Sequence, residues 1–245
     1  MNAIRIGRCI YCGRAEGPLR REHMIAAGLN GPWVLQKASC PACEKVTSAF
    51  EGHVLGGPFR LARAGLKMHT GHGFPTTAPL LIDRGDGGYV SVEVPVKDYP
   101  VLVHFVEFLR PAHLDTRPYA GGIDISGHRM IQVAGPDPKD VGQRLGAKRM
   151  RWVATHESHS LPRLIAKIAY TILVADVGLD GIEVAYVLPA ILGQSQNIGR
   201  WVGCDEMEYI TDQTVLHGGR RLYSGRTGAG SGVQDLCLRA DLAPS

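Results

Sequence analysis

Four of the six cysteines form two Cys-x-x-Cys pairs, Cys9-Ile-Tyr-Cys12 and Cys40-Pro-Ala-Cys43, separated by 27 residues. Each pair presents two sulfurs on one tight turn, and four thiolates can close a tetrahedral Zn²⁺ site. Six cysteines in 245 residues do not make a disulfide scaffold, so the paired spacing favours metal. The sequence therefore predicts a structural zinc on Cys9, Cys12, Cys40 and Cys43. A redox dithiol is the alternative, although a redox motif would need only one pair.

A glutamate and a histidine, Glu22 and His23, lie near the middle of the segment between the two cysteine pairs. Imidazole titrates near neutrality and can take a proton from water, while a carboxylate oxygen suits a hard cation such as Mg²⁺. These two residues could therefore take part in metal-assisted hydrolysis. The alternative is an exposed ion pair at the end of a strand.

The residues around these side chains predict a strand followed by a helix. Residues 33–38 have the composition of a short strand. Residues 41–55 predict a helix, because Pro41 suits a first turn and Gly56-Gly57 follows the end. Glu44 then lies in the first helical turn, directly after the second cysteine pair. His53 is half a turn away on the opposite helix face, whereas Ser48 is one turn on from Glu44 and better placed beside an ion.

In this order of elements, residues 7–58 resemble the HNH endonucleases, whose fold is the ββα-metal or His-Me finger. The resemblance implies that His23 is the general base and that Glu22 and Glu44 bind a catalytic Mg²⁺ or Mn²⁺. The chain departs from the family at Glu44, where His or Asn is usual. It also lacks the middle Asn before the second strand, although Asn30 could instead brace the His23 backbone.

The excess positive charge of the chain lies with the cysteines. Residues 1–72 carry a balance of +6, and residues 73–245 carry −2. Such asymmetry is typical of a module that binds a polyanion, although small domains also carry a few surplus charges by chance. Residues 146–152 and 217–226 form weaker basic clusters that could extend the same track. The candidate nucleic-acid contacts are Arg20, Arg21, Lys37, Lys45, Arg60, Arg63 and Lys67.

A cluster of Gly, Pro and Thr in residues 65–79 predicts a domain boundary near residue 72. Beyond it, residues 80–94 and 122–134 each predict a hairpin. Residues 161–177 predict an amphipathic helix that ends at Gly178. The apolar residues of its expected core stripe are Leu161, Leu164, Ile165, Ile168, Ala169, Ile172 and Leu173.

We therefore expect an α+β protein with an N-terminal HNH module (residues 1–72) that carries structural zinc. A larger α+β domain with antiparallel strands (residues 73–245) would follow. The expected activity is hydrolysis of phosphodiester bonds in DNA. The alternative is a decayed, zinc-stabilised module that only binds nucleic acid. Residues 73–245 could regulate the N-terminal module by binding a regulatory ligand or a protein partner.

The remaining expectations concern thiols, location and other enzyme classes. Cys204 and Cys237 are expected to be buried thiols. No stretch approaches eighteen apolar residues and no secretory signal is visible, so we expect a cytoplasmic protein without a membrane partner. The motifs of P-loop nucleotide-binding proteins, α/β-hydrolases and HExxH zinc proteases are missing from the sequence.

Overall fold

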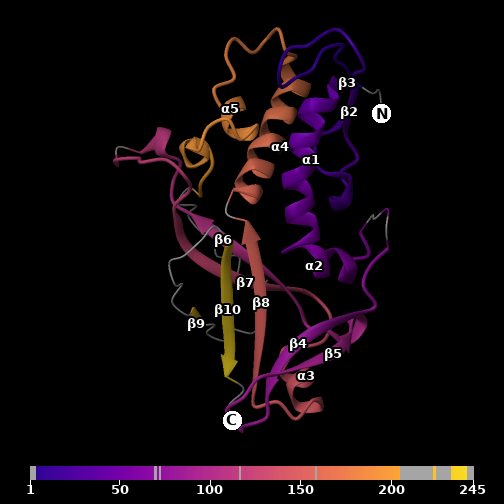
Figure 1. Cartoon of the computed structure of the whole chain (residues 1–245), viewed down its shortest axis with the longest axis vertical. Helices are drawn as coiled ribbons and strands as arrows, with labels where there is room; N and C mark the ends of the chain where they lie inside the picture. Colours follow the sequence, from indigo (N-terminus) through magenta and orange to yellow (C-terminus); the bar gives the residue numbers. More distant parts are fainter. Residues whose placement is uncertain are drawn as a thin grey trace, which may run out of the picture.

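The computed structural model describes residues 4–68, 71, 73–115, 117–157, 159–204, 223–224 and 233–241. These residues form a mixed α+β protein whose sheets are small and mostly antiparallel. Helices α1 (Pro41–Gly56) and α4 (Ser160–Val177) lie side by side at one end of the molecule, and the strands of the largest sheet lie at the other end (Figure 1).

The N-terminal sheet has the order β1-β3-β2 and leads directly into α1. Strand β2 (Arg20–His23) pairs antiparallel with β3 (Val34–Ser39), and β1 (Ile4–Arg5) pairs parallel with β3. Cys40 caps α1 and Pro41 occupies its first turn, where the missing N–H of proline costs no hydrogen bond. The predicted strand at residues 33–38 and helix at residues 41–55 are thus confirmed to within one residue at each end.

The largest sheet contains the predicted hairpin of residues 80–94. Strand β4 (Thr77–Asp83) pairs antiparallel with β5 (Val90–Pro95), and the full order is β5-β4-β8-β10-β9. The other members are β8 (Arg149–Glu157), β10 (Val233–Asp241) and the short β9 (Tyr223–Ser224).

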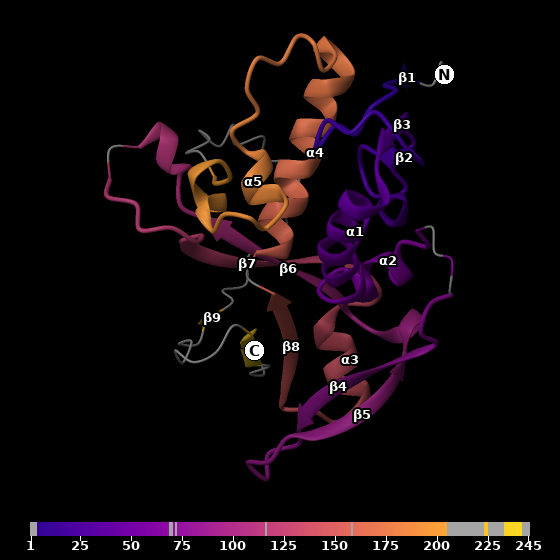
Figure 2. The ribbon, with the colours of Figure 1, turned by 45° about the horizontal axis from the view of Figure 1, so that its top comes forward.

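A separate two-stranded ribbon lies between the helical end and the largest sheet (Figures 1 and 2). It pairs β6 (Val101–Phe108) antiparallel with β7 (Ile125–Ala134). The predicted hairpin within residues 122–134 is therefore wrong. Gly127 does not turn the chain, because it pairs with Glu107 inside one continuous ten-residue strand.

Short helices complete the described fold: η1 (Ala27–Leu29), α2 (Arg60–Gly65), η2 (Val96–Asp98), η3 (Ala112–Leu114), α3 (Pro138–Arg144), α5 (Leu188–Ile191) and η4 (Asn197–Arg200). None of the helices in the described part of the chain combines the length and apolar character that crossing a membrane requires.

Helix α4 has the predicted length but buries a different face. Ile165, Ile172 and Leu173 were expected in the core and are more than 40% exposed. The buried face instead includes polar side chains that find partners in the N-terminal sheet and loops. Tyr170 donates to the carbonyl of Ile10, and Thr171 donates to the carbonyl of Met24 at 3.2 Å. Hydrophobic periodicity cannot detect such a face. Its polar side chains can be buried only because backbone carbonyls of the N-terminal segment accept their hydrogen bonds, and the sequence of α4 does not indicate those acceptors.

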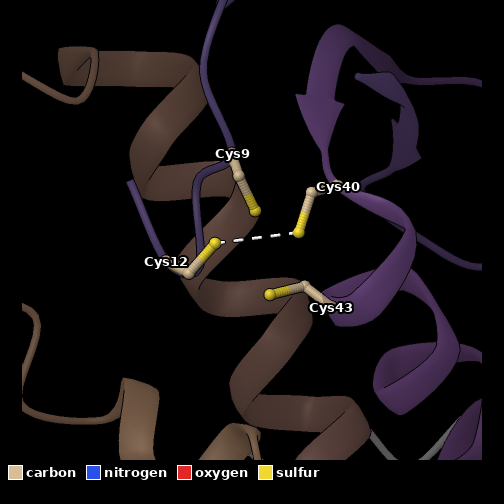
Figure 3. Close-up of side chains that lie close together, drawn as sticks. All are labelled: Cys9, Cys12, Cys40 and Cys43. Atoms are coloured by element: carbon tan, nitrogen blue, oxygen red, sulfur yellow. Dashed lines mark hydrogen bonds between the residues drawn. The ribbon is translucent and has the colours of Figure 1, made fainter. Parts of the chain in front are cut away.

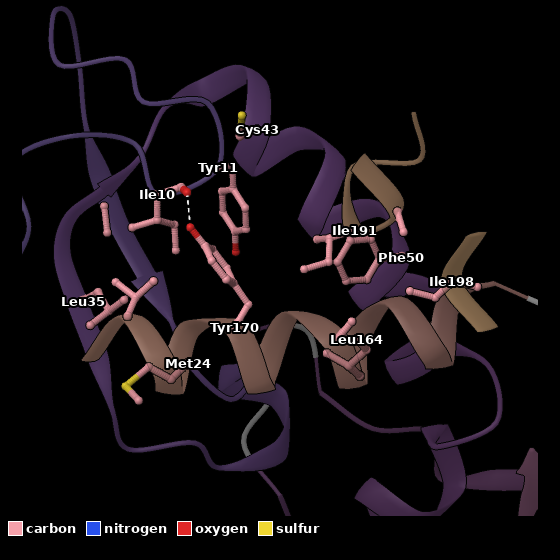
Figure 4. Close-up of a cluster of buried hydrophobic side chains, with 14 of the residues drawn as sticks. Ile10, Tyr11, Met24, Leu35, Cys43, Phe50, Leu164, Tyr170, Ile191 and Ile198 are labelled. Carbon is pink, nitrogen blue, oxygen red and sulfur yellow. Dashed lines mark hydrogen bonds between the residues drawn. The ribbon is translucent and has the colours of Figure 1, made fainter. Parts of the chain in front are cut away.

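The first hydrophobic core crosses the predicted boundary near residue 72. Residues before the boundary, such as Tyr11 and Phe50, share it with Leu164, Tyr170 and Ile198 (Figure 4). The boundary falls between α2 and β4, yet the N-terminal segment packs on α4 as one unit. A second core lies between the largest sheet, the β6–β7 ribbon and α2.

Candidate metal centre and the adjoining histidine pocket

The four paired cysteines converge on one point (Figure 3). Cys9 and Cys12 lie on a turn after β1, and Cys40 and Cys43 lie at the start of α1. Their sulfurs all lie within 4.8 Å of one another, and those of Cys12 and Cys40 are 3.7 Å apart. A tetrahedral zinc with Zn–S bonds of about 2.3 Å places its sulfurs about 3.8 Å apart. The cluster could therefore hold a metal ion, and its size is consistent with structural zinc.

Backbone hydrogen bonds shape both turns of the cluster. The N–H of Cys9 donates to Arg14 at 2.7 Å, and the N–H of Gly13 donates to Cys9 at 2.9 Å. Gly13 has φ 75°, a left-handed conformation that favours glycine. On the helix side, the N–H of Glu44 donates to the carbonyl of Cys40 at 2.9 Å. The sulfurs are thus held in place by the backbone of two separate segments.

The thiols of the cluster differ in acidity. Burial raises the pKa of Cys9 and of Cys43. Burial acts in the same direction on Cys40, but the hydrogen bond from the backbone of Cys43, together with the neighbouring thiols, lowers the pKa of Cys40 to about 7. Four sulfurs this close cannot all carry charge without a cation, and a bound divalent ion would supply that charge.

His23 and Glu44 line one open pocket of about 520 Å³ beside the cysteine cluster. The remaining lining residues are Arg20, Arg21 and Gln36. His23 ends β2 and is half-buried, while Glu44 lies in the first turn of α1. The structure thus brings together two of the three residues for which we predicted a catalytic role.

An ion pair crosses this pocket. Nη1 of Arg20 donates to Oε2 of Glu44 at 2.8 Å, and the two side chains are 60% and 32% exposed. Exposed pairs of this kind contribute only about 0–1 kcal/mol, since water competes for both partners. A ligand that binds either side chain more strongly could therefore separate the pair at a small cost in free energy.

Glu22 does not reach this pocket. Successive side chains of a strand point to opposite faces, and here His23 lines the pocket while Glu22 enters the core. Glu22 is only 5% exposed, and its Oε1 lies 2.8 Å from Nζ of Lys167 on α4. Its predicted role as a ligand of the catalytic ion is at odds with this position, and we do not retain it.

Lys167 is fully buried, and three oxygen atoms lie around its ammonium group. Its Nζ lies 2.8 Å from Oε1 of Glu22 and 2.8 Å from Oε1 of Glu51 on α1. It also donates to the backbone carbonyl of His23. Two carboxylate oxygens and one carbonyl oxygen therefore surround this buried charge, and the two carboxylates oppose it in sign. Lys167 thereby ties β2, α1 and α4 together directly behind the pocket.

The pKa of Glu22 reflects this environment. Burial raises it most, Lys167 lowers it, and the nearby Glu51 raises it again, with a net upward shift. Sequence reasoning missed both Lys167 and Glu51. The only signal in the sequence was a lysine on the helix between Leu164 and Tyr170, both of which are buried. This signal does not identify a carboxylate partner that lies more than a hundred residues away.

A bulge in β3 adjoins the pocket. Arg20 pairs with Ser39 and Glu22 pairs with Leu35, so β3 contributes two extra residues between these positions. Lys37 at the bulge has φ 51°, which is uncommon for a residue with a side chain. Bulges redirect neighbouring side chains and are frequent beside functional sites. Gln36, which the sequence did not single out, lies at this bulge and lines the pocket.

The predicted basic track is only partly assembled. Arg20 and Arg21 line the pocket, and the exposed Lys45 follows Glu44 on α1. Arg63 instead binds backbone: Nε donates to Gly28 at 2.7 Å and Nη1 donates to Leu55 at 3.0 Å. It fastens the loop after β2 to the end of α1, so it is not part of an exposed ridge. Arg60, Lys37 and Lys67 are exposed, but none of the three lines this pocket.

The helical spacing correctly predicted that His53 lies away from Glu44. Its Nδ1 lies 3.3 Å from Oγ of Ser160 at the start of α4, away from the pocket. Asn30 ends η1 with φ 59°, and its predicted bracing of His23 stays a prediction. Cys204 is exposed, so its predicted burial is wrong.

Two predictions fall largely outside the described residues. The side chain of Cys237 on β10 is not described, and the basic cluster at residues 217–226 lies outside apart from β9.

Comparison with family models, curated proteins and solved structures yields no match for this chain.

Proposed function

We propose that this protein is a metal-dependent endonuclease of the HNH type that hydrolyses phosphodiester bonds in DNA. The observation that carries the proposal is the shared pocket of His23 and Glu44 beside a four-cysteine cluster. The succession of β2, β3 and α1 also follows the order expected of a ββα module.

Arg20 and Arg21 would bind the phosphate backbone at this pocket. Guanidinium groups match phosphate oxygens with two parallel hydrogen bonds, and they do so without regard to base sequence. Because the pair between Arg20 and Glu44 is exposed, an incoming phosphate can take over Arg20 and release the carboxylate. Substrate binding and the freeing of Glu44 would then be one event.

His23 would remove the proton from the attacking water. Its ring lines the pocket, and its backbone carbonyl is fixed by the buried ammonium of Lys167. A general base contributes most when its position is fixed, and the contact between Lys167 and the His23 carbonyl fixes the end of this strand. Lys167 is thus a positioning residue, which acts through His23.

A divalent ion, Mg²⁺ or Mn²⁺, would polarise the phosphate and stabilise the leaving oxygen. Glu44 would hold it, and Gln36 lines the same pocket. Mg²⁺ is commonly held by one or two carboxylates together with water and substrate phosphates. Because Glu22 faces the core, only one carboxylate of the predicted pair would neutralise the ion, which leaves it positive charge for the phosphate.

A second candidate function is nucleic-acid binding without cleavage. Two observations favour it: Glu22 is held in the core by Lys167, and Glu44 is held by Arg20. In this case the cysteine cluster would stabilise a basic surface, and the pocket would bind a phosphate only.

Incubating the protein with supercoiled plasmid and Mg²⁺ or Mn²⁺ tests the proposal. We expect nicking that is lost in His23→Ala but kept in the control His113→Ala, whose ring is exposed on η3. Glu44→Ala should lose activity, whereas Glu44→Asn should retain it because an amide oxygen can still bind the ion.

Zinc content and DNA affinity must be measured on the same samples. Equal zinc in every variant would show that lost nicking reflects the pocket. No nicking with either metal, together with DNA binding that weakens in Arg21→Gln, would leave the binding module as the function.

A further inference from the structure

The side of α4 that points away from the first core is apolar and yet exposed. At about 100° per residue, Ile165, Ala169 and Ile172 lie on one stripe, and the buried Val174 lies on the opposite side of the helix. Ile165 is 42% exposed and Ile172 is 44% exposed. We call this stripe and its exposed apolar neighbours the outer face of α4; its members are Ile165, Ala169, Ile172, Leu173 and Val177.

The outer face carries no charge over about three helical turns. Between Arg163 and Asp176 the only charged residue of α4 is Lys167, which is buried on the other side. A helix face in contact with water normally carries charged and polar side chains, and a continuous exposed apolar surface marks a site of interaction. The outer face therefore suits an apolar partner surface.

The shape of the outer face is complementary to itself. Ala169 leaves a hollow, and the bulky Ile172 lies about one turn further along the same stripe. If two copies of α4 pack antiparallel about a two-fold axis between these positions, each Ile172 lies over the partner's Ala169. An isologous contact of this kind pairs large side chains with small ones on both sides of the axis.

The charges at the two ends of α4 favour the same antiparallel arrangement. The first turn contains no acidic residue, and the last turn contains no basic residue but carries the exposed Asp176. None of the described residues forms an ion pair with Asp176. An acidic side chain is unfavourable at the negative C-terminal end of a helix dipole and favourable near the positive N-terminal end. An antiparallel pair brings each Asp176 toward the N-terminal turns of the partner helix, whereas a parallel pair would bring the two carboxylates together.

We propose that the outer face of α4 is the contact surface of a homodimer, in which α4 packs antiparallel against α4 of a second copy of this chain. One helix face is smaller than the roughly 800 Å² per partner that a standard interface buries, so the dimer forms reversibly at micromolar concentrations. The side of α4 that holds Lys167 behind the histidine pocket is not part of this contact. The inference therefore does not depend on nuclease activity.

Sedimentation velocity of the full-length, zinc-loaded protein tests the proposal at concentrations from about 1 to 200 µM. We expect a shift from monomer to dimer as the concentration rises. Ile172→Glu places a charge at the centre of the contact and should raise the dimer Kd at least about tenfold. The matched control is Val90→Glu, because Val90 is 46% exposed on β5 at the other end of the molecule (Figure 1). It should dimerise like the unmodified protein.

Two further variants test the packing and the orientation. Ala169→Ile fills the hollow that receives Ile172, so it should weaken the dimer, although on a face without a partner it would change nothing. Asp176→Asn should weaken an antiparallel dimer at least about threefold, because two favourable charge–dipole contacts are lost. The same change would strengthen a parallel pair.

Three results would overturn the assignment. A chain that stays monomeric over the whole concentration range would leave the outer face to a different partner. A dimer that Ile172→Glu leaves intact would place the contact elsewhere, and a dimer that Asp176→Asn strengthens would exclude the antiparallel arrangement. All the replaced side chains are exposed, and circular dichroism checks that each variant folds. If Ile172→Glu fails that check, Ala169→Ile still decides whether this face forms the contact.

Discussion

Replacing Lys167 with methionine is the most informative single change to this molecule. Methionine fills a similar volume but cannot donate a hydrogen bond. The substitution leaves the buried Glu22 on β2 and the half-buried Glu51 on α1, each without the ammonium that lay 2.8 Å away. The carbonyl of His23 loses the donor that Lys167 provided. Stability and catalysis should both respond, for separate reasons.

The effect on stability can be estimated from burial. Lys167 is 0% exposed, and removing one partner of a buried ion pair typically costs about 3–5 kcal/mol. Domains are stable by only about 5–15 kcal/mol, so the loss is a large fraction of the total. Lys97→Met is the matched control, because Lys97 is exposed on η2 and should change stability by less than about 0.5 kcal/mol.

A triple variant separates charge from position. Lys167→Met combined with Glu22→Gln and Glu51→Gln removes the whole buried network, and such replacements are often nearly neutral in stability. Urea unfolding followed by circular dichroism should show most of the loss recovered. Nicking should stay low or shift in pH profile, because His23 still lacks its brace. Full stability in the single variant, or full activity in the triple variant, would refute the reasoning.

Three further predictions concern the metal, the pH dependence and the domain boundary. Cys12→Ser should lose zinc to a chelator at least tenfold faster than Cys204→Ser, as measured with a colorimetric zinc indicator, because only Cys12 belongs to the cluster. The raised pKa of Glu22 means that its contribution to folding is fully present below the ordinary value of 4.5 and is lost as pH rises through the raised value. Glu22→Gln should remove that component when urea unfolding is compared between pH 4 and 7, and parallel curves would contradict it. Residues 1–72 alone should show no cooperative thermal transition even with zinc, because their core lacks α4; a sharp transition would show that they fold as a separate domain.

The elements that could be predicted from the sequence are those whose determinants are local. The two Cys-x-x-Cys pairs specify the metal cluster through their own turns, and Pro41 and Gly57 delimit α1. The β4–β5 hairpin follows from alternation around a glycine-rich turn. In each case the residues that decide the structure lie within a few positions of one another.

The remaining features depend on contacts between distant segments. Strand β7 continues through Gly127 because β6 pairs with it on both sides of that glycine, and nothing in residues 122–134 indicates that partner. The inward direction of Glu22 depends on Lys167, a residue from the other end of the chain. An adjacent Glu-His pair suggests a shared site. However, the side chains of two consecutive residues in a regular strand point to opposite faces of the sheet. Here the core offers Glu22 a better partner than the pocket does.

The packing of α4 changes what the cysteine cluster has to do. A module of about 55 residues standing alone would need a structural metal in order to fold, since its core is too small. In this chain α4 provides Leu164, Tyr170 and Val174 to that core, and Lys167 fastens α4 to the strands. Global stability therefore no longer rests on the cluster alone. Cys40 and Cys43 still lie at the start of the helical turn that carries Glu44, so a bound metal would fix that turn to the Cys9–Cys12 turn after β1. Metal removal should accordingly disturb the histidine pocket at concentrations of chelator that leave the α1–α4 core folded.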